Sequence, residues 1–164
     1  MQNTKLDKRS LVRVRMMKIL YTADLNKVDI FEANKILSEN DIEDEKEDPI
    51  NEKELNESVS FINENLNKID EIISNSLVGY KINRLNLVDK SIVRVATAEM
   101  LMNKLAKTII INEALEITKL YSNLGDHKAV SFNNGIVRKH GGRVQIQQHR
   151  IVLIVVGGQI HIII

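Results

Sequence analysis

The chain has 164 residues, long enough to bury one sizeable hydrophobic core or two small subdomains without covalent cross-links. It contains no cysteine, which excludes a disulfide framework. Aromatic residues make up only 4% of the chain and tryptophan is absent, which argues against aromatic stacking on single-stranded nucleic acid. The formal net charge is +1, so the total indicates no class of partner and the distribution of charge matters more.

No basic-then-apolar leader is apparent at Met1, and residues 1–140 contain no apolar run long enough to span a bilayer. We therefore expect a cytoplasmic protein with no membrane partner.

The first twenty residues are strongly basic. Against one acid, Asp7, they carry six cations: Lys5, Lys8, Arg9, Arg13, Arg15 and Lys18. Apolar residues recur there at three- and four-residue spacing, which predicts a helix over residues 11–25 with Ser10 as its N-cap and an inward face of Leu11, Val14, Met17, Tyr21 and Leu25. So many cations at one helix start favour a polyanion as partner. The alternative is an ordinary solvated basic surface.

Further helices are expected along the chain, about seven in all. One covers residues 30–40 with Asp29 as its cap, and an acidic loop follows. Residues 54–77 keep a helical period, although three asparagines suggest a bend or a break into two helices. Later helices cover residues 87–101 and 111–122, and the last begins at Asp126 and ends at Gly141.

The stretch "INRLNLVDKSIVRVATAEML", residues 82–101, combines a packed apolar stripe with several charges. We expect Arg94 to pair with an internal carboxylate such as Glu113 or Glu116. Asp89 and Lys90 stand at the start of this helix, which we expect to be exposed, and are better candidates for contact with an external partner.

The last stretch, residues 141–164, has a different composition, because β-branched residues dominate and Asn, Lys and Glu are absent. One interpretation is a β-hairpin around Gly157-Gly158 that covers part of the helical bundle. The other, which we favour, is an atypical tail that is foreign to the domain or disordered.

No catalytic motif is present: the sequence has no phosphate-cradling glycine loop and no HExxH pattern. The four histidines are widely spread, which argues against a metal site. We expect neither an enzyme nor a cofactor.

Four stretches occur in order over residues 8–140: "LVRVRMMKILYTADL", "RLNLVDKSIVRVATAEML", "IINEALEITKLYS" and "SFNNGIVRK". Together they resemble the bacterial antitermination factor NusB family. The resemblance implies an all-α fold of two small orthogonal helical bundles, here about residues 1–80 and 81–140. It also implies an RNA-binding adaptor without catalytic activity that binds boxA-type RNA together with NusE, a ribosomal protein, in the transcription elongation complex.

The resemblance assigns roles to particular residues. The RNA surface of the family centres on its basic first helix and corresponds here to Lys8, Arg9 and Arg13; Lys5 and Arg15 extend the same cluster of cations. Its protein-partner surface corresponds to Tyr21 and Asp89, next to Lys90. Asp126 aligns with an acidic residue of that surface through a short insertion.

The chain departs from the family pattern after Arg13, where Val14 replaces the usual glutamate. This departure keeps open a helical protein-interaction module without RNA binding. A further alternative is the NusB-like RNA-binding module of an rRNA cytosine methyltransferase.

Overall fold

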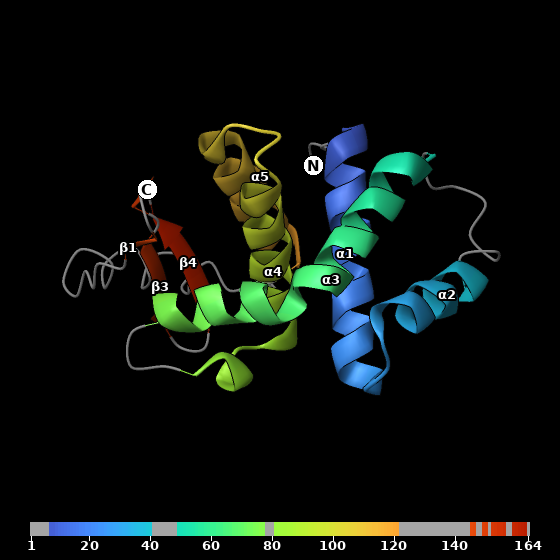
Figure 1. Cartoon of the computed structure of the whole chain (residues 1–164), viewed down its shortest axis with the longest axis horizontal. Coiled ribbons are helices and arrows are strands. Elements are labelled where there is room, and N and C mark those ends of the chain that lie inside the picture. The colour runs from blue at the N-terminus through green and yellow to red at the C-terminus, as the bar shows by residue number, and fades with distance from the viewer. Residues whose placement is uncertain are drawn as a thin grey trace. The chain divides into compact units, whose positions relative to one another are not determined.

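A computed structural model describes residues 7–40, 49–77 and 81–121 together with four short strands between residues 145 and 163. Up to residue 121 all the described secondary-structure elements are helices, which confirms the predicted all-α class for this part of the chain. The α-helices are α1 (Lys8–Asn26), α2 (Ile30–Asn40), α3 (Glu52–Ser76), α4 (Leu87–Met102) and α5 (Lys107–Tyr121), as Figure 1 shows. A single 3-10 turn, η2 (Ile82–Arg84), precedes α4.

The described residues thus hold five α-helices where we expected about seven. One of the two missing helices came from a predicted break, at the asparagines, that would divide residues 54–77 into two helices. The prediction of a break is wrong, because α3 runs without interruption from Glu52 to Ser76. The other, expected from Asp126, lies outside the described residues.

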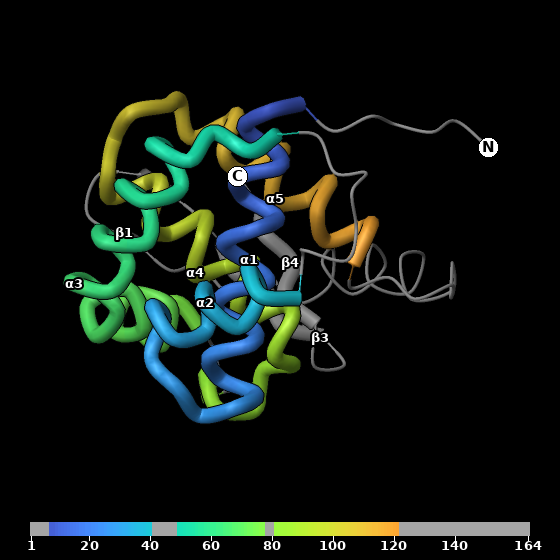
Figure 2. The backbone as a smooth tube through the Cα atoms, turned by 90° about the vertical axis from the view of Figure 1, so that its right-hand side faces the viewer, coloured from blue at the N-terminus to red at the C-terminus, as the bar shows by residue number. Residues whose placement is uncertain are grey.

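The chain groups into two compact units, residues 1–65 and 66–164. The boundary falls inside α3, whereas the sequence placed it near residue 80. In the first unit α1 packs against α2, and Figure 2 shows the short connection between these two helices. In the second unit α4 packs against α5. Each unit buries its own set of aliphatic side chains, Met16, Ile19, Leu20, Ala33, Leu55, Val59 and Ile62 in the first and Ile69, Ile73, Ile92, Val95, Ile110 and Ile111 in the second.

Helix α1 begins one turn earlier than its apolar pattern indicates. Its N-cap is Asp7, whose carboxylate Oδ1 accepts a hydrogen bond from the backbone N–H of Ser10 at 2.7 Å. The predicted cap at Ser10 is therefore wrong, since Ser10 is the third residue of the helix and is buried. Lys27 ends the helix in a left-handed conformation with φ 55°.

Three other described helices, α2, α3 and α4, also begin at a side-chain cap. Asp29 caps α2 as predicted, accepting from the N–H of Glu32 at 2.9 Å. Asn51 accepts from the N–H of Glu54 at the start of α3. Asn86 accepts from two N–H groups, those of Val88 and Asp89, at the start of α4. These short polar side chains satisfy backbone donors that have no partner within a helix, so local sequence fixes where these helices begin.

The tail contains two antiparallel pairs, β1 (Gln145–Ile146) with β2 (His149–Arg150) and β3 (Val152–Val156) with β4 (Gln159–Ile163). The second pair has the register of the hairpin considered from the sequence, because Val156 lies opposite Gln159. Residues of β4 lie near α4 and α5 in the same unit. The tail is thus β-structured where it is described.

Candidate nucleic-acid interface

The first turn of α1 presents two exposed cations, Lys8 and Arg9, which we call the basic helix start. Both follow directly after the capping residue Asp7. The hydrogen bond from the backbone N–H of Ser10 lowers the pKa of the Asp7 carboxyl below its ordinary value of 3.8, and the nearby positive charge of Arg13 adds to this effect. The cap is therefore ionised at neutral pH, and it holds the helix start that carries both cations. Lys5, predicted as part of the same surface, lies outside the described residues.

The other two predicted RNA contacts on this helix are buried. The exposed fraction is 5% for Arg13 and 6% for Arg15, whereas their predicted role as RNA contacts requires exposed side chains. The expectation of exposure is wrong because the aliphatic stem of an arginine packs well among apolar neighbours when its guanidinium finds polar contacts. For Arg15 these contacts include Ser38 on α2, whose Oγ accepts from Nη2 at 3.1 Å.

The last turns of α1 and the first turn of α2 carry a partly apolar surface. Tyr21, the predicted partner contact, is half-buried. Leu25 and Phe31 are each 53% exposed, so the prediction that Leu25 faces inward is wrong. The sequence pattern did not single out Phe31, although its place in the first turn of α2, two residues after the Asp29 cap, gave a signal, since apolar side chains there need not face the core.

The start of α4 differs most from expectation. Asp89 is 1% exposed and Lys90 is half-buried, whereas the sequence placed both at an exposed helix start. Asp89 occupies the first turn, where its backbone N–H donates to the Asn86 side chain at 3.3 Å. A carboxylate is favoured near a helix N-terminus because of the positive end of the helix dipole. Asp126, the remaining predicted partner residue, lies outside the described residues.

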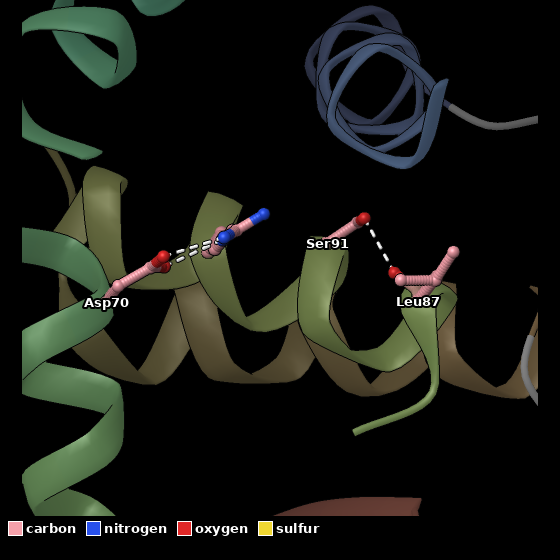
Figure 3. A network of polar contacts seen from close by, with 4 residues as sticks. Asp70, Leu87 and Ser91 are labelled. Atoms are coloured by element: carbon pink, nitrogen blue, oxygen red, sulfur yellow. Dashed lines mark hydrogen bonds and ion pairs between the residues drawn. The ribbon is translucent and has the colours of Figure 1, made fainter. Parts of the chain in front are cut away.

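Arg94 pairs with an internal carboxylate, as expected, but the carboxylate belongs to Asp70 on α3. Its Nε donates to Oδ1 and its Nη2 donates to Oδ2, both at 2.7 Å (Figure 3). Arg94 is therefore held by a bidentate pair within the second unit. Glu116, one of the two partners suggested from the sequence, instead pairs with Lys119 on α5 at 2.6 Å.

Beside this pair, the Ser91 hydroxyl donates to the carbonyl of Leu87 at 2.7 Å (Figure 3), so Ser91 is bonded to the backbone of its own helix while Arg94 is bonded to α3. Over the described ranges, no three metal-ligating side chains come together in a cluster that could hold an ion. Within the same ranges, no helix has both the length and the apolar composition required to cross a membrane.

Fold and surface together define a helical domain with an exposed basic start to its first helix and a charged, largely buried start to α4. The NusB family model matches residues 10–140, which is most of the chain. The chain belongs to the NusB family.

Relatives agree with this assignment. The chain is 33% identical over 128 residues to the transcription antitermination protein NusB of Clostridium perfringens, a match that covers 77% of this chain and 91% of that protein. It is 32% identical over 131 residues to the protein of the same name from Bacillus subtilis, covering 79% and 92%. The match to the NusB protein of Trichormus variabilis is 41% identical over 81 residues, but it spans only 49% of this chain and 37% of that protein.

Solved structures share the fold. The chain matches T. maritima NusB with a TM-score of 0.61 and 30% identity, covering 82% of this chain and 91% of the other. A structure of the antitermination factors NusB and NusE in complex with double-stranded RNA matches with a TM-score of 0.61 and 21% identity, covering 82% and 96%. At this lower identity the second match shows the fold alone.

Proposed function

We propose that this chain is a transcription antitermination factor that binds boxA-type RNA together with NusE in the cytoplasm and acts as an adaptor in the elongation complex. The relatives' name describes a regulatory role and no catalysed reaction, and the proposed adaptor has no enzymatic activity. The observation that carries the RNA-binding part is the basic helix start, because Lys8 and Arg9 are exposed on a helix turn fixed by the Asp7 cap.

Electrostatics favours RNA as the ligand of this surface. Lys8 and Arg9 lie at the N-terminal end of α1, where the helix dipole already contributes positive potential. A cation at this end gains nothing from its own helix, so a polyanion is the ligand that would compensate both the side chains and the dipole. Phosphate contacts of this kind supply affinity and orientation, while base contacts supply sequence preference.

The buried cations take a different part in the proposal. Arg13 and Arg15 are too enclosed to contact phosphate as the side chains stand, with 5% and 6% exposure. We assign them to support of the helix that presents Lys8 and Arg9. Lys5 stays a proposed RNA contact on the strength of its charge and its place in the sequence before the cap.

The NusE-binding surface is proposed to include Tyr21, Asp89 and Lys90, with Asp126 as a further member. Tyr21 and Lys90 are half-buried and keep part of their surface accessible. Asp89 is buried in the first turn of α4, so we propose that it supports the turn that carries Lys90.

The adaptor is favoured over a methyltransferase module because the match extends over 91% and 92% of the Clostridium and Bacillus proteins, which carry the antitermination name. Equilibrium binding of the full chain to boxA RNA and to a scrambled RNA, each with and without NusE, tests the proposal. We expect a preference for boxA RNA that NusE strengthens. Equal, weak binding to both RNAs with NusE binding retained would instead support a protein-interaction module without RNA binding.

A further inference from the structure

The guanidinium of Arg15 connects α1 to the backbone of α2 through one hydroxyl. Its Nη2 donates to Ser38 Oγ at 3.1 Å, and Ser38 Oγ in turn donates to the carbonyl of Asn34 at 2.9 Å. All three residues belong to the first unit. Because a hydroxyl both donates and accepts, Ser38 passes the arginine contact on to the α2 main chain.

Because Arg15 is buried, its contact with Ser38 restricts how α1 and α2 can pack. Arg15 is 6% exposed, and a buried guanidinium is costly unless its donors are directed at acceptors. Its donors are fixed in one plane, so the position of Ser38 restricts the angle at which α2 meets α1. A phosphate would have to displace protein atoms to reach this side chain, whereas Lys8 and Arg9 are already accessible.

The same contact also limits how α1 can rotate about its own axis. Lys8 and Arg15 are seven positions apart, which is two helical turns, or about 10 Å along the axis, and places them on the same side of the helix. Loss of the contact at Arg15 would let α1 rotate against α2. The exposed cations of the first turn would then change direction.

We infer that Arg15 is a positioning residue for RNA binding: through Ser38 it fixes α1 against α2 and thereby orients Lys8 and Arg9, and it does not itself contact phosphate. The inference rests on the proposed function and adds to it a residue that acts from the interior of the first unit.

Salt titration separates a positioning residue from a phosphate contact. The full chain, with NusE at a fixed saturating concentration, is titrated with boxA RNA over a range of salt concentrations. Arg15→Met should weaken binding about threefold to tenfold at every salt concentration and leave the slope of log affinity against log salt unchanged. Arg9→Ala should instead flatten this slope by about 0.7, because each phosphate contact on a single strand releases about that many counterions.

A double-mutant cycle tests whether Arg15 acts through Ser38. Ser38→Ala should weaken binding in the same salt-independent way, and the double variant with Arg15→Met should lose no more than Arg15→Met alone. Ser38→Thr keeps the hydroxyl and should restore most of the affinity. Ser58→Ala is the matched control, because the Ser58 hydroxyl likewise donates to the carbonyl four residues earlier, that of Glu54, at 2.8 Å, but this bond lies within α3 and takes no part in the contact between Arg15 and Ser38. This variant should leave binding unchanged.

The outcomes distinguish this inference from the proposed function. If the wild-type chain does not prefer boxA RNA, the proposed function fails. If wild type binds and Arg15→Met flattens the slope by about 0.7, Arg15 contacts phosphate and the inference is overturned. Unchanged affinity of Arg15→Met, or additive losses in the double variant, overturns it as well. Should Arg15→Met fail to fold by circular dichroism, Ser38→Ala alone decides, since unchanged affinity of that variant contradicts the inference.

Discussion

Arg94 and Asp70 form a bidentate ion pair in which both nitrogen-to-oxygen distances are 2.7 Å, and it joins α4 to α3 within the second unit. The Arg94 side chain is 7% exposed and that of Asp70 is 29% exposed. The arginine is therefore committed to the interior of the domain. This accounts for part of the charge on the otherwise apolar α4.

Breaking this pair from one side should destabilise the chain. Asp70→Ala leaves the Arg94 guanidinium buried without its carboxylate, and we expect a loss of about 3 kcal/mol in the free energy of unfolding, measured by urea denaturation. The double variant with Arg94→Met should recover much of this loss, because it removes the buried charge. Glu116→Ala is the control: it breaks an exposed pair with Lys119 and should cost less than about 0.5 kcal/mol. Equal effects of Asp70→Ala and Glu116→Ala would show that the Arg94 pair contributes no more than a surface contact.

The Asp7 cap should make stability depend on acid pH. Its folded-state pKa lies below the ordinary value of 3.8, chiefly because the carboxylate accepts the Ser10 N–H. The stabilisation is therefore fully present above the unfolded-state pKa and is lost as the pH falls through the folded-state pKa. Asp7→Asn keeps an acceptor at the cap but cannot titrate, so its melting midpoint should fall less than that of wild type between pH 5 and about pH 3. Parallel decreases in both proteins would remove Asp7 from the acid response.

The burial of Asp89 predicts a structural cost that an exposed residue would not have. Asp89→Lys places a cation in a nearly inaccessible site at the wrong end of the helix dipole, so we expect it to reduce the free energy of unfolding by about 3 kcal/mol or more. Lys90→Glu, one residue later and half-buried, should cost less and should weaken NusE binding, which calorimetry can measure. A stable Asp89→Lys protein that had lost only NusE affinity would instead show that Asp89 faces the partner directly.

The tail offers a separate test. The family match ends at residue 140, and β4 lies near α4 and α5. We expect truncation after His140 to preserve helical content and RNA binding, with little change in the melting midpoint. A fall of more than about 4 °C, roughly 1 kcal/mol for a chain of this length, would show that the tail stabilises the second unit.

Local sequence predicted most helix positions, since capping residues and apolar spacing act over a few residues. Asp29 caps α2 as expected, and α4 begins at Leu87 as expected. The failures depend on contacts between distant segments. The partner of Arg94 lies 24 residues earlier on another helix, and helical spacing on α4 carries no information about it.

The sequence also could not predict which charged side chains of α1 are buried. The pattern on α1 shows which positions are apolar, but it cannot show that a neighbouring helix covers the polar flank as well. For Arg15, α2 supplies an acceptor, Ser38, to the buried guanidinium. In the same way, the cations that stay exposed, Lys8 and Arg9, could be distinguished from the buried ones only once α2 was in place.

The central claim is that Lys8 and Arg9 bind the phosphates of boxA-type RNA. The most direct measurement is the salt dependence of RNA affinity for wild type, for Lys8→Ala/Arg9→Ala and for a control with two exposed lysines replaced on other helices, Lys35→Ala/Lys53→Ala. We predict that the first double variant flattens the slope of log affinity against log salt by about 1.4 and weakens binding to boxA and scrambled RNA alike, while the control keeps the wild-type slope. A folded Lys8→Ala/Arg9→Ala protein with the wild-type slope would contradict the account.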